Sequence, residues 1–271
     1  MVYFSKRCAM AILLAWGAVA PLSAAEAVAD PLSQYREMLG GDNPADLWVS
    51  RGEALWTEPR GPRKATLVQC DLGLGAGVVK GAYARLPRYF SETGAVEDLE
   101  SRLVSCMVQF QGFKREEILA SRFGDGERHS SDLEALVAYV VTASKGERMA
   151  VPQNTSQEKR AYSMGKAIFF YRAGTHDFSC ATCHSADNKR IRLQALPNLT
   201  TPTGAQAAYT TWPAYRVSQG EFRTMEWRLN DCFRQQRLPD LKYGSPAAIA
   251  LTEYLARNAN GAVLAAPAIK R

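Results

Sequence analysis

Five consecutive residues, Cys180-Ala181-Thr182-Cys183-His184, carry the most specific chemical signal in the chain. In this C-x-x-C-H motif, two thiols can form thioether bonds to a haem and the imidazole that follows can bind its iron. The alternatives are a redox dithiol, which usually lies in a βαβ context that is absent here, and a partial zinc site, which needs further Cys or His ligands at suitable spacing. The motif therefore indicates a covalently attached c-type haem.

A second axial ligand for such an iron commonly comes from beyond the motif, as Met or His. After His184 the sequence contains no histidine, and the soft ligands that remain are Met225 and Cys232. Met225 would give a high-potential electron carrier, whereas a Cys232 thiolate would give an electron-rich haem of low potential. We favour Cys232, because an exported thiol without a disulfide partner needs another role. Met225 stays open as the alternative.

Arginines are concentrated around Cys232. Arg228 lies four residues earlier, so a helix over residues 222–234 would place both side chains on one face. A guanidinium stabilises a neighbouring thiolate and offers a planar fork to an oxyanion. Further arginines stand at Arg223, Arg234 and Arg237. The pattern predicts an anion-binding site beside Cys232, and the alternatives are a solvated surface arginine and an inert buried thiol.

The elements that must position these residues are predicted to be helices. Residues 132–141 and 246–255 have apolar positions at helical spacing. Ser130 or Ser131 can cap the first helix, and a proline is well placed at the first turn of the second, after Ser245. Alternating patterns typical of strands are scarce. The sequence therefore predicts an all-α chain.

Three segments recur in the same order in the two halves of the chain, which indicates an internal duplication. The pairs are residues 52–56 with 165–169, residues 100–109 with 226–235, and the two helices just described. The middle pair shares the pattern E-x-R-L-x-x-C-x-x-Q. A polar stretch with a proline at residues 150–157 separates the halves. We predict two tandem domains, residues 26–155 and residues 156–271.

The first half has no haem motif. Cys70 stands where the first haem cysteine would be, but Gly73 and Leu74 occupy the positions of the second cysteine and the histidine. This half therefore cannot bind haem covalently in the usual way. Cys106 is the repeat counterpart of Cys232. We predict a Cys70–Cys106 disulfide in place of the lost haem cross-links, with two reduced core thiols as the alternative.

Residues 1–25 have the layout of a secretory signal peptide: Lys6 and Arg7, an apolar run over residues 9–20, and a small-x-small site at residues 23–25. We expect export to the periplasm and no membrane span after cleavage; an uncleaved tether is the alternative. Cleavage would lower the net charge from +6 to +4.

A net charge of +4, with no Lys/Arg-rich run, argues against nucleic-acid binding. A length of 271 residues with 46% hydrophobic and 22% charged residues fits a soluble two-domain protein.

Beyond the haem motif, the chain resembles the A component of the sulfur-oxidising (Sox) AX cytochromes, which are L-cysteine S-thiosulfotransferases. The resemblance covers nearly all of the chain after residue 25. Besides the haem motif it is carried by Lys189-Arg190-Ile191-Arg192, Leu196-Pro197-Asn198, Trp212-Pro213, Gln219-Gly220-Glu221 and Trp227-Arg228-Leu229-Asn230-Asp231-Cys232. Many cytochromes share the haem motif, whereas the Arg-x-x-x-Cys segment that follows Gln-Gly-Glu is much more specific.

The resemblance implies a role for each candidate residue. Cys180 and Cys183 would anchor one haem c, with His184 as the proximal iron ligand. Cys232 would be the distal ligand, held as a cysteine persulfide and used as the catalytic sulfur. Arg228 would bind the sulfonate of thiosulfate. Members of this family have two cytochrome c-like domains with one or two haems, and the missing motif in the first half makes this chain similar to the single-haem members.

The implied reaction joins thiosulfate to a cysteine of the Sox YZ carrier protein. Two electrons would leave through the haem to a small cytochrome c partner, subunit X, in a heterodimer. One rival is a thiosulfate dehydrogenase, which couples two thiosulfates to tetrathionate without a carrier. The others are a plain electron-transfer cytochrome c that uses Met225, and a protein in which the haem only stabilises the fold.

Overall fold

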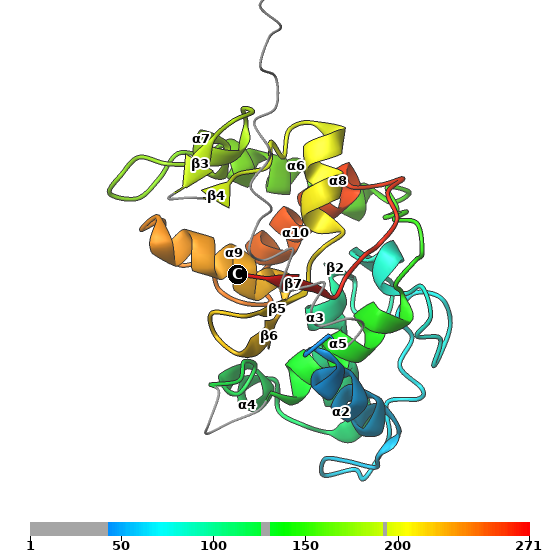
Figure 1. The fold of residues 1–271 in the computed structure, drawn as a ribbon. Coiled ribbons are helices and arrows are strands. Elements are labelled where there is room, and N and C mark those ends of the chain that lie inside the picture. Colours follow the sequence, from blue (N-terminus) through cyan, green and yellow to red (C-terminus); the bar gives the residue numbers. More distant parts are fainter. Residues whose placement is uncertain (1–42, 126–130, 192–193) are drawn as a thin grey trace, which may run out of the picture.

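The computed structural model describes residues 43–125, 131–191 and 194–271 (Figure 1). The predicted signal peptide, residues 1–25, lies outside these ranges, and so does Ser130, one of the two candidate caps. In the part of the chain that the structure describes, no helix has the length and apolar character needed to cross a membrane.

Helices make up most of the regular structure, and short strands lie between them along the chain. In chain order the elements are α2 (Asp46–Thr57), the 3-10 turn η1 (Tyr83–Arg85), β1 (Arg88–Phe90), β2 (Ala95–Glu97), α3 (Leu99–Cys106), the π-helical turn η2 (Met107–Gln111), α4 (Arg115–Ala120), α5 (Asp132–Ala143), α6 (Ser156–Phe170), α7 (Cys180–His184), β3 (Arg190–Ile191), β4 (Gln194–Ala195), α8 (Pro202–Tyr209), β5 (Ala214–Arg216), β6 (Glu221–Arg223), α9 (Met225–Gln235), α10 (Pro246–Asn258) and β7 (Ala268–Lys270).

Each half of the chain contains one close helix crossing. α2 packs on α5, and α6 packs on α10, in separate parts of the molecule (Figure 1). A Cβ atom placed on Gly52 of α2 would lie 2.0 Å from the carbonyl oxygen of Ala135. A Cβ placed on Gly165 of α6 would lie 1.9 Å from the carbonyl oxygen of Ala250. Both glycines hold the same place in the sequence repeat, so their matching contacts support the duplication.

The two helices predicted most directly are confirmed. α5 covers residues 132–141, and the Ser131 side chain accepts a hydrogen bond from the backbone N–H of Glu134. α10 covers residues 246–255, and the Ser245 side chain accepts from the backbone N–H of Ala248. Each cap satisfies a donor that the first turn of a helix leaves without an intrahelical partner.

The third predicted helix begins later than expected. Residues 222 and 223 lie in β6, and α9 starts at Met225. Thr224 stops the helix from extending backwards, because its backbone is extended and its side chain accepts a hydrogen bond from the N–H of Trp227. Arg228 and Cys232 still lie together on α9, one helical turn apart.

The expectation of an all-α chain is correct for the helical framework but misses three small sheets. β1 pairs with β2 and β3 pairs with β4, whereas β5 lies between β6 and β7. β7 comes from the chain terminus and runs parallel to β5. Strands of two or three residues are too short to show a period-two pattern, and the parallel partner of β5, β7, lies more than fifty residues away in the sequence.

A disulfide links Cys70 to Cys106 in the first half, with a Cα–Cα distance of 5.6 Å. Both cysteines are fully buried. Beside Cys70, the Asp71 carboxylate accepts hydrogen bonds from the backbone N–H groups of Gly73 and Gly75, and Gly73 has a φ of 101°. This left-handed turn replaces the short helix that carries the haem motif in the second half.

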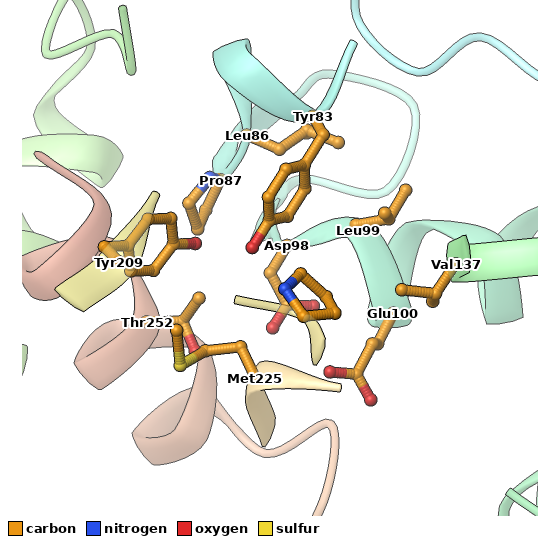
Figure 2. A pocket seen from close by; sticks show the side chains of 11 residues that line it. Tyr83, Leu86, Pro87, Asp98, Leu99, Glu100, Val137, Tyr209, Met225 and Thr252 are labelled. Atoms are coloured by element: carbon orange, nitrogen blue, oxygen red, sulfur yellow. The ribbon is translucent and has the colours of Figure 1, made fainter. Parts of the chain in front are cut away.

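The two halves meet around a buried polar interior, which includes a small pocket (Figure 2). Glu100 and Glu226 hold the same position in the repeat, and the backbone N–H of Glu226 donates to the Glu100 carboxyl at 3.0 Å. Arg223 forms an ion pair with the buried Glu134 at 2.9 Å. Burial raises the pKa of Glu100 to about 8.

The boundary between the two domains at residue 155 remains a prediction. The helix α6 begins at the next residue, Ser156.

Candidate functional site

The short helix α7 contains the whole C-x-x-C-H motif. Ser179 precedes it and accepts a hydrogen bond from the N–H of Thr182, while the Thr182 hydroxyl accepts one from the N–H of Ser179. This reciprocal cap explains why the chain turns into a helix at this point. It presents Cys180 and Cys183, one turn apart, as free thiols that are each partly exposed.

His184 is held in the form that a metal ion requires. Its Nδ1 lies 2.9 Å from the carbonyl oxygen of Pro197 and must donate, because a carbonyl only accepts. The Nε2 atom therefore keeps its lone pair for iron. Burial lowers the pKa of His184, and the nearby charge of Arg228 lowers it further, whereas the hydrogen bond to Pro197 opposes this shift. The imidazole is thus favoured in its neutral state.

Cys232 of α9 lies close to the haem motif. Burial raises the pKa of the Cys232 thiol, Arg228 and Arg216 lower it, and Cys183 raises it. Burial also raises the pKa of Cys180 to about 12, with Cys232 as the next largest cause. The thiols of Cys180, Cys183 and Cys232 therefore lie within electrostatic range of one another, and Arg228 lies within that range of Cys232.

Arg228 is oriented by a carboxylate that the sequence analysis did not single out. Its Nη1 lies 3.1 Å from Oδ2 of Asp231, whose side chain is 5% exposed. Asp231 also accepts hydrogen bonds from Arg234 at 2.6 Å and Gln235 at 2.7 Å. The Arg228 side chain is 29% exposed and lies beside the ring of Trp212. The sequence feature that could have identified Asp231 is its spacing: it stands three residues after Arg228 and three before Arg234, where helical side chains can form ion pairs.

The residues present fit a covalently attached haem. Two free thiols have haem-attachment spacing, an imidazole has one free nitrogen, and a third thiol lies nearby. Over residues 43–125, 131–191 and 194–271, no three His, Cys, Asp or Glu side chains are grouped so that they could hold a metal ion directly.

Comparison with known proteins supplies the family. The sequence pattern described as "SoxA/TsdA, cytochrome c domain" matches residues 51–149 and 164–264. This chain belongs to the SoxA/TsdA cytochrome c family. The two matched segments correspond to the two halves of the repeat, and a cytochrome c domain implies haem c as the cofactor.

Curated relatives in the family match along nearly their whole length. An L-cysteine S-thiosulfotransferase subunit SoxA from Hydrogenophilus thermoluteolus is 52% identical over 258 residues, which cover 94% of each chain. A protein of the same name from Hydrogenobacter thermophilus is 31% identical over 247 residues, and this match covers 90% of this chain and 89% of the relative. The crystal structure of SoxXA from P. pantotrophus has a similar fold, with a TM-score of 0.71, 22% identity, and coverage of 88% of this chain and 84% of the other.

Within this SoxA/TsdA chain, the repeat provides an internal control for Arg228. Its counterpart in the first half is Arg102, which is 2% exposed. Arg102 pairs with Glu92 and Glu97 and lies 3.8 Å from the centre of the Phe90 ring. Two acids and an aromatic face therefore occupy Arg102, whereas Arg228 keeps exposed surface and pairs with a single acid. Of these two counterparts, Arg228 in the second half is the one whose exposed surface leaves room for an anion.

The alternative iron ligand, Met225, lies elsewhere. Its side chain is buried and lines the pocket between the halves, together with Tyr83, Asp98 and Thr252 (Figure 2). No residue of α7 lines that pocket. Met225 is also almost two helical turns from Cys232 along α9. These positions favour Cys232 over Met225 as the sulfur nearest to the motif.

Proposed function

We propose that this chain is an L-cysteine S-thiosulfotransferase subunit that couples thiosulfate to a cysteine of a carrier protein. The observation that carries the proposal is the placement of Arg228 and Cys232 one turn apart on α9, with Cys232 within electrostatic range of Cys183 of the haem motif. The names of the two relatives described above support the same activity. This coupling needs a site that binds the anion, a reactive sulfur and a route for the electrons.

The cofactor would be a single haem c. Thioethers from Cys180 and Cys183 would attach it, and His184 and Cys232 would supply ligands to its iron. When bound, the haem would supply an acceptor of single electrons. In the first half, the Cys70–Cys106 disulfide uses both repeat cysteines, which leaves no thiol there for a second attachment.

The protein residues would act on the anion and on the sulfur. Arg228, oriented by Asp231, would hold the sulfonate, and Cys232 would place its sulfur beside that anion. In the net reaction the carrier thiol and thiosulfate form a sulfur–sulfur bond and release one proton and two electrons. The electron-rich thiolate and the cationic arginine favour the charge distribution that this oxidation requires.

The partners follow from the same chemistry. A small cytochrome c, subunit X, would accept the electrons in a heterodimer, and the Sox YZ carrier would bring its cysteine to the exposed side of Arg228. The signal peptide predicted at residues 1–25 would direct the chain to the periplasm, where c-type haem is attached.

The activity can be tested with purified components. The mature chain, subunit X, the carrier and an oxidised electron acceptor are mixed with thiosulfate, and the carrier cysteine is analysed by mass spectrometry. We expect a thiosulfonate adduct on that cysteine and none on a carrier whose cysteine is replaced by serine. Rapid formation of tetrathionate with an unmodified carrier would instead identify a thiosulfate dehydrogenase.

A further inference from the structure

A second arginine, Arg216, lies beside the proposed site. It ends β5, the central strand of the three-stranded sheet, where it is opposite Glu221 of β6 and Lys270 of β7 in register. β6 passes through one residue, Thr224, into α9. The sheet therefore fixes the Arg216 backbone on both sides, and the chain connects that sheet directly to the helix that carries Arg228 and Cys232.

The guanidinium of Arg216 lies within electrostatic range of residues on α9. Three of the four charged groups that most affect its pKa come from α9: Arg228 lowers it, and Asp231 and Cys232 raise it, while burial is the largest cause and lowers it. Arg216 in turn lowers the pKa of the Cys232 thiol. Two guanidiniums on separate elements, Arg228 on α9 and Arg216 on β5, therefore act electrostatically on the Cys232 thiol.

The Arg216 guanidinium has a buried donor with no acceptor in the described residues. Its Nε is buried and makes no hydrogen bond to any other group in the described ranges. The nearby acid, Asp231, already accepts from Arg228, Arg234 and Gln235. No described carboxylate forms an ion pair with Arg216; the ion pairs of its neighbourhood join Asp231 to the other two arginines. A half-buried cation next to another cation, with an unsatisfied donor, is costly unless an anion completes the site.

We propose that Arg216 is a second substrate-binding residue, which holds the sulfonate of thiosulfate together with Arg228. This inference rests on the proposed function and adds a residue to the same site. Thiosulfate carries two negative charges and three sulfonate oxygens, which matches two guanidinium forks better than one. One N–H of Arg228 donates to Asp231 and is not available to the sulfonate. The guanidinium of Arg216 would supply further donors. Holding the sulfonate from two elements also leaves the other sulfur of thiosulfate free to face Cys232.

The test compares steady-state transfer to the carrier by the wild type, Arg216→Gln, Arg216→Lys and a control, Arg172→Gln. Arg172 forms an ion pair with Asp177 at 2.9 Å outside the proposed site, and its side chain is 61% exposed. We expect Arg216→Gln to raise the KM for thiosulfate by about tenfold or more, because it loses charge-assisted hydrogen bonds. Arg216→Lys keeps the charge but not the fork and should give a smaller increase. Arg172→Gln should stay within about twofold of the wild type, the residual effect expected of an exposed ion pair.

The thermal midpoint and haem spectrum of each variant separate binding from folding. A raised KM with both unchanged supports a binding role, and a KM unchanged in both Arg216 variants overturns it. A fall in kcat alone, or a loss in step with the thermal midpoint, also overturns it. If the wild type leaves the carrier unmodified, the proposed function fails. Arg216 is then tested by calorimetric titration of the oxidised haem protein with thiosulfate alone, and equal affinity in the wild type and Arg216→Gln refutes the proposal.

Discussion

Replacement of Arg228 by glutamine tests the anion site in a way that leaves its framework in place. Gln235 still donates to Oδ2 of Asp231 and Arg234 still pairs with Oδ1, so the carboxylate that orients Arg228 keeps two partners. The substitution removes the charge and the fork while it retains a side chain of similar length. A loss of activity would therefore reflect the loss of anion binding more than a collapse of α9.

The size of the effect follows from the exposure of the site. A hydrogen bond to a charged group contributes about 1.5–3 kcal/mol. Arg228 is 29% exposed, which favours the lower part of that range through solvent screening. Because about 1.4 kcal/mol corresponds to a factor of ten, we expect kcat/KM for thiosulfate to fall by roughly 10- to 50-fold. The loss should lie mainly in KM, since the sulfonate is held both before and during the reaction.

The assay is the rate of carrier modification as a function of thiosulfate concentration, at fixed subunit X and acceptor. Arg234→Gln removes an equal charge from the same aspartate, and we expect it to change kcat/KM by no more than about twofold. If Arg228→Gln and Arg234→Gln have equal effects, general electrostatic attraction explains the activity and a specific sulfonate contact is refuted. A fall of less than threefold for Arg228→Gln would refute it as well.

Three further predictions concern the framework, each measured by urea unfolding of the haem protein. Replacing Cys70 and Cys106 by alanine should lower the free energy of unfolding by about 4 kcal/mol, because the disulfide closes a loop with a sequence separation of 36; an unchanged value would show that it is dispensable. Gly165→Ala should cost about 2 kcal/mol or more, since the new Cβ would meet the Ala250 carbonyl oxygen at 1.9 Å; an alanine tolerated at no cost would contradict the close crossing. Burial raises the pKa of Glu100 to about 8, so the folded state holds a proton that the unfolded state releases above about pH 4.5, and stability should fall as pH rises from 5 to 8. Glu100→Gln should flatten this fall, and an identical pH profile would refute the linkage.

Features set by local sequence were the ones that the sequence predicted well. Ser131 caps α5 through a bond to a residue three positions later, and a proline stands in the first turn of α10, both of which depend only on neighbouring residues. The Cys70–Cys106 pairing followed from comparing the two repeats, because equivalent positions in a duplicated fold occupy equivalent places. Both signals are contained in short stretches of the chain or in its internal symmetry.

Features set by contacts between distant segments were missed. The sheet that holds Arg216 joins residues 214–216 to the last strand of the chain, and nothing within either segment indicates the other. The start of α9 at Met225 depends on the pairing of residues 221–223 with that sheet. The burial of Glu100 against Glu226 likewise depends on how the two halves pack, which no local pattern shows.

The central claim is that the sulfur of Cys232 carries out the coupling of thiosulfate to the carrier. Its most direct test is a Cys232→Ala variant, which keeps Cys180 and Cys183 for haem attachment and His184 for the iron. The mass of the protein verifies the haem, and the mass of the carrier cysteine reports the reaction with thiosulfate and subunit X. We predict a variant that retains its haem and leaves the carrier unmodified, while the wild type converts it to the thiosulfonate. Full modification of the carrier by Cys232→Ala would contradict the account.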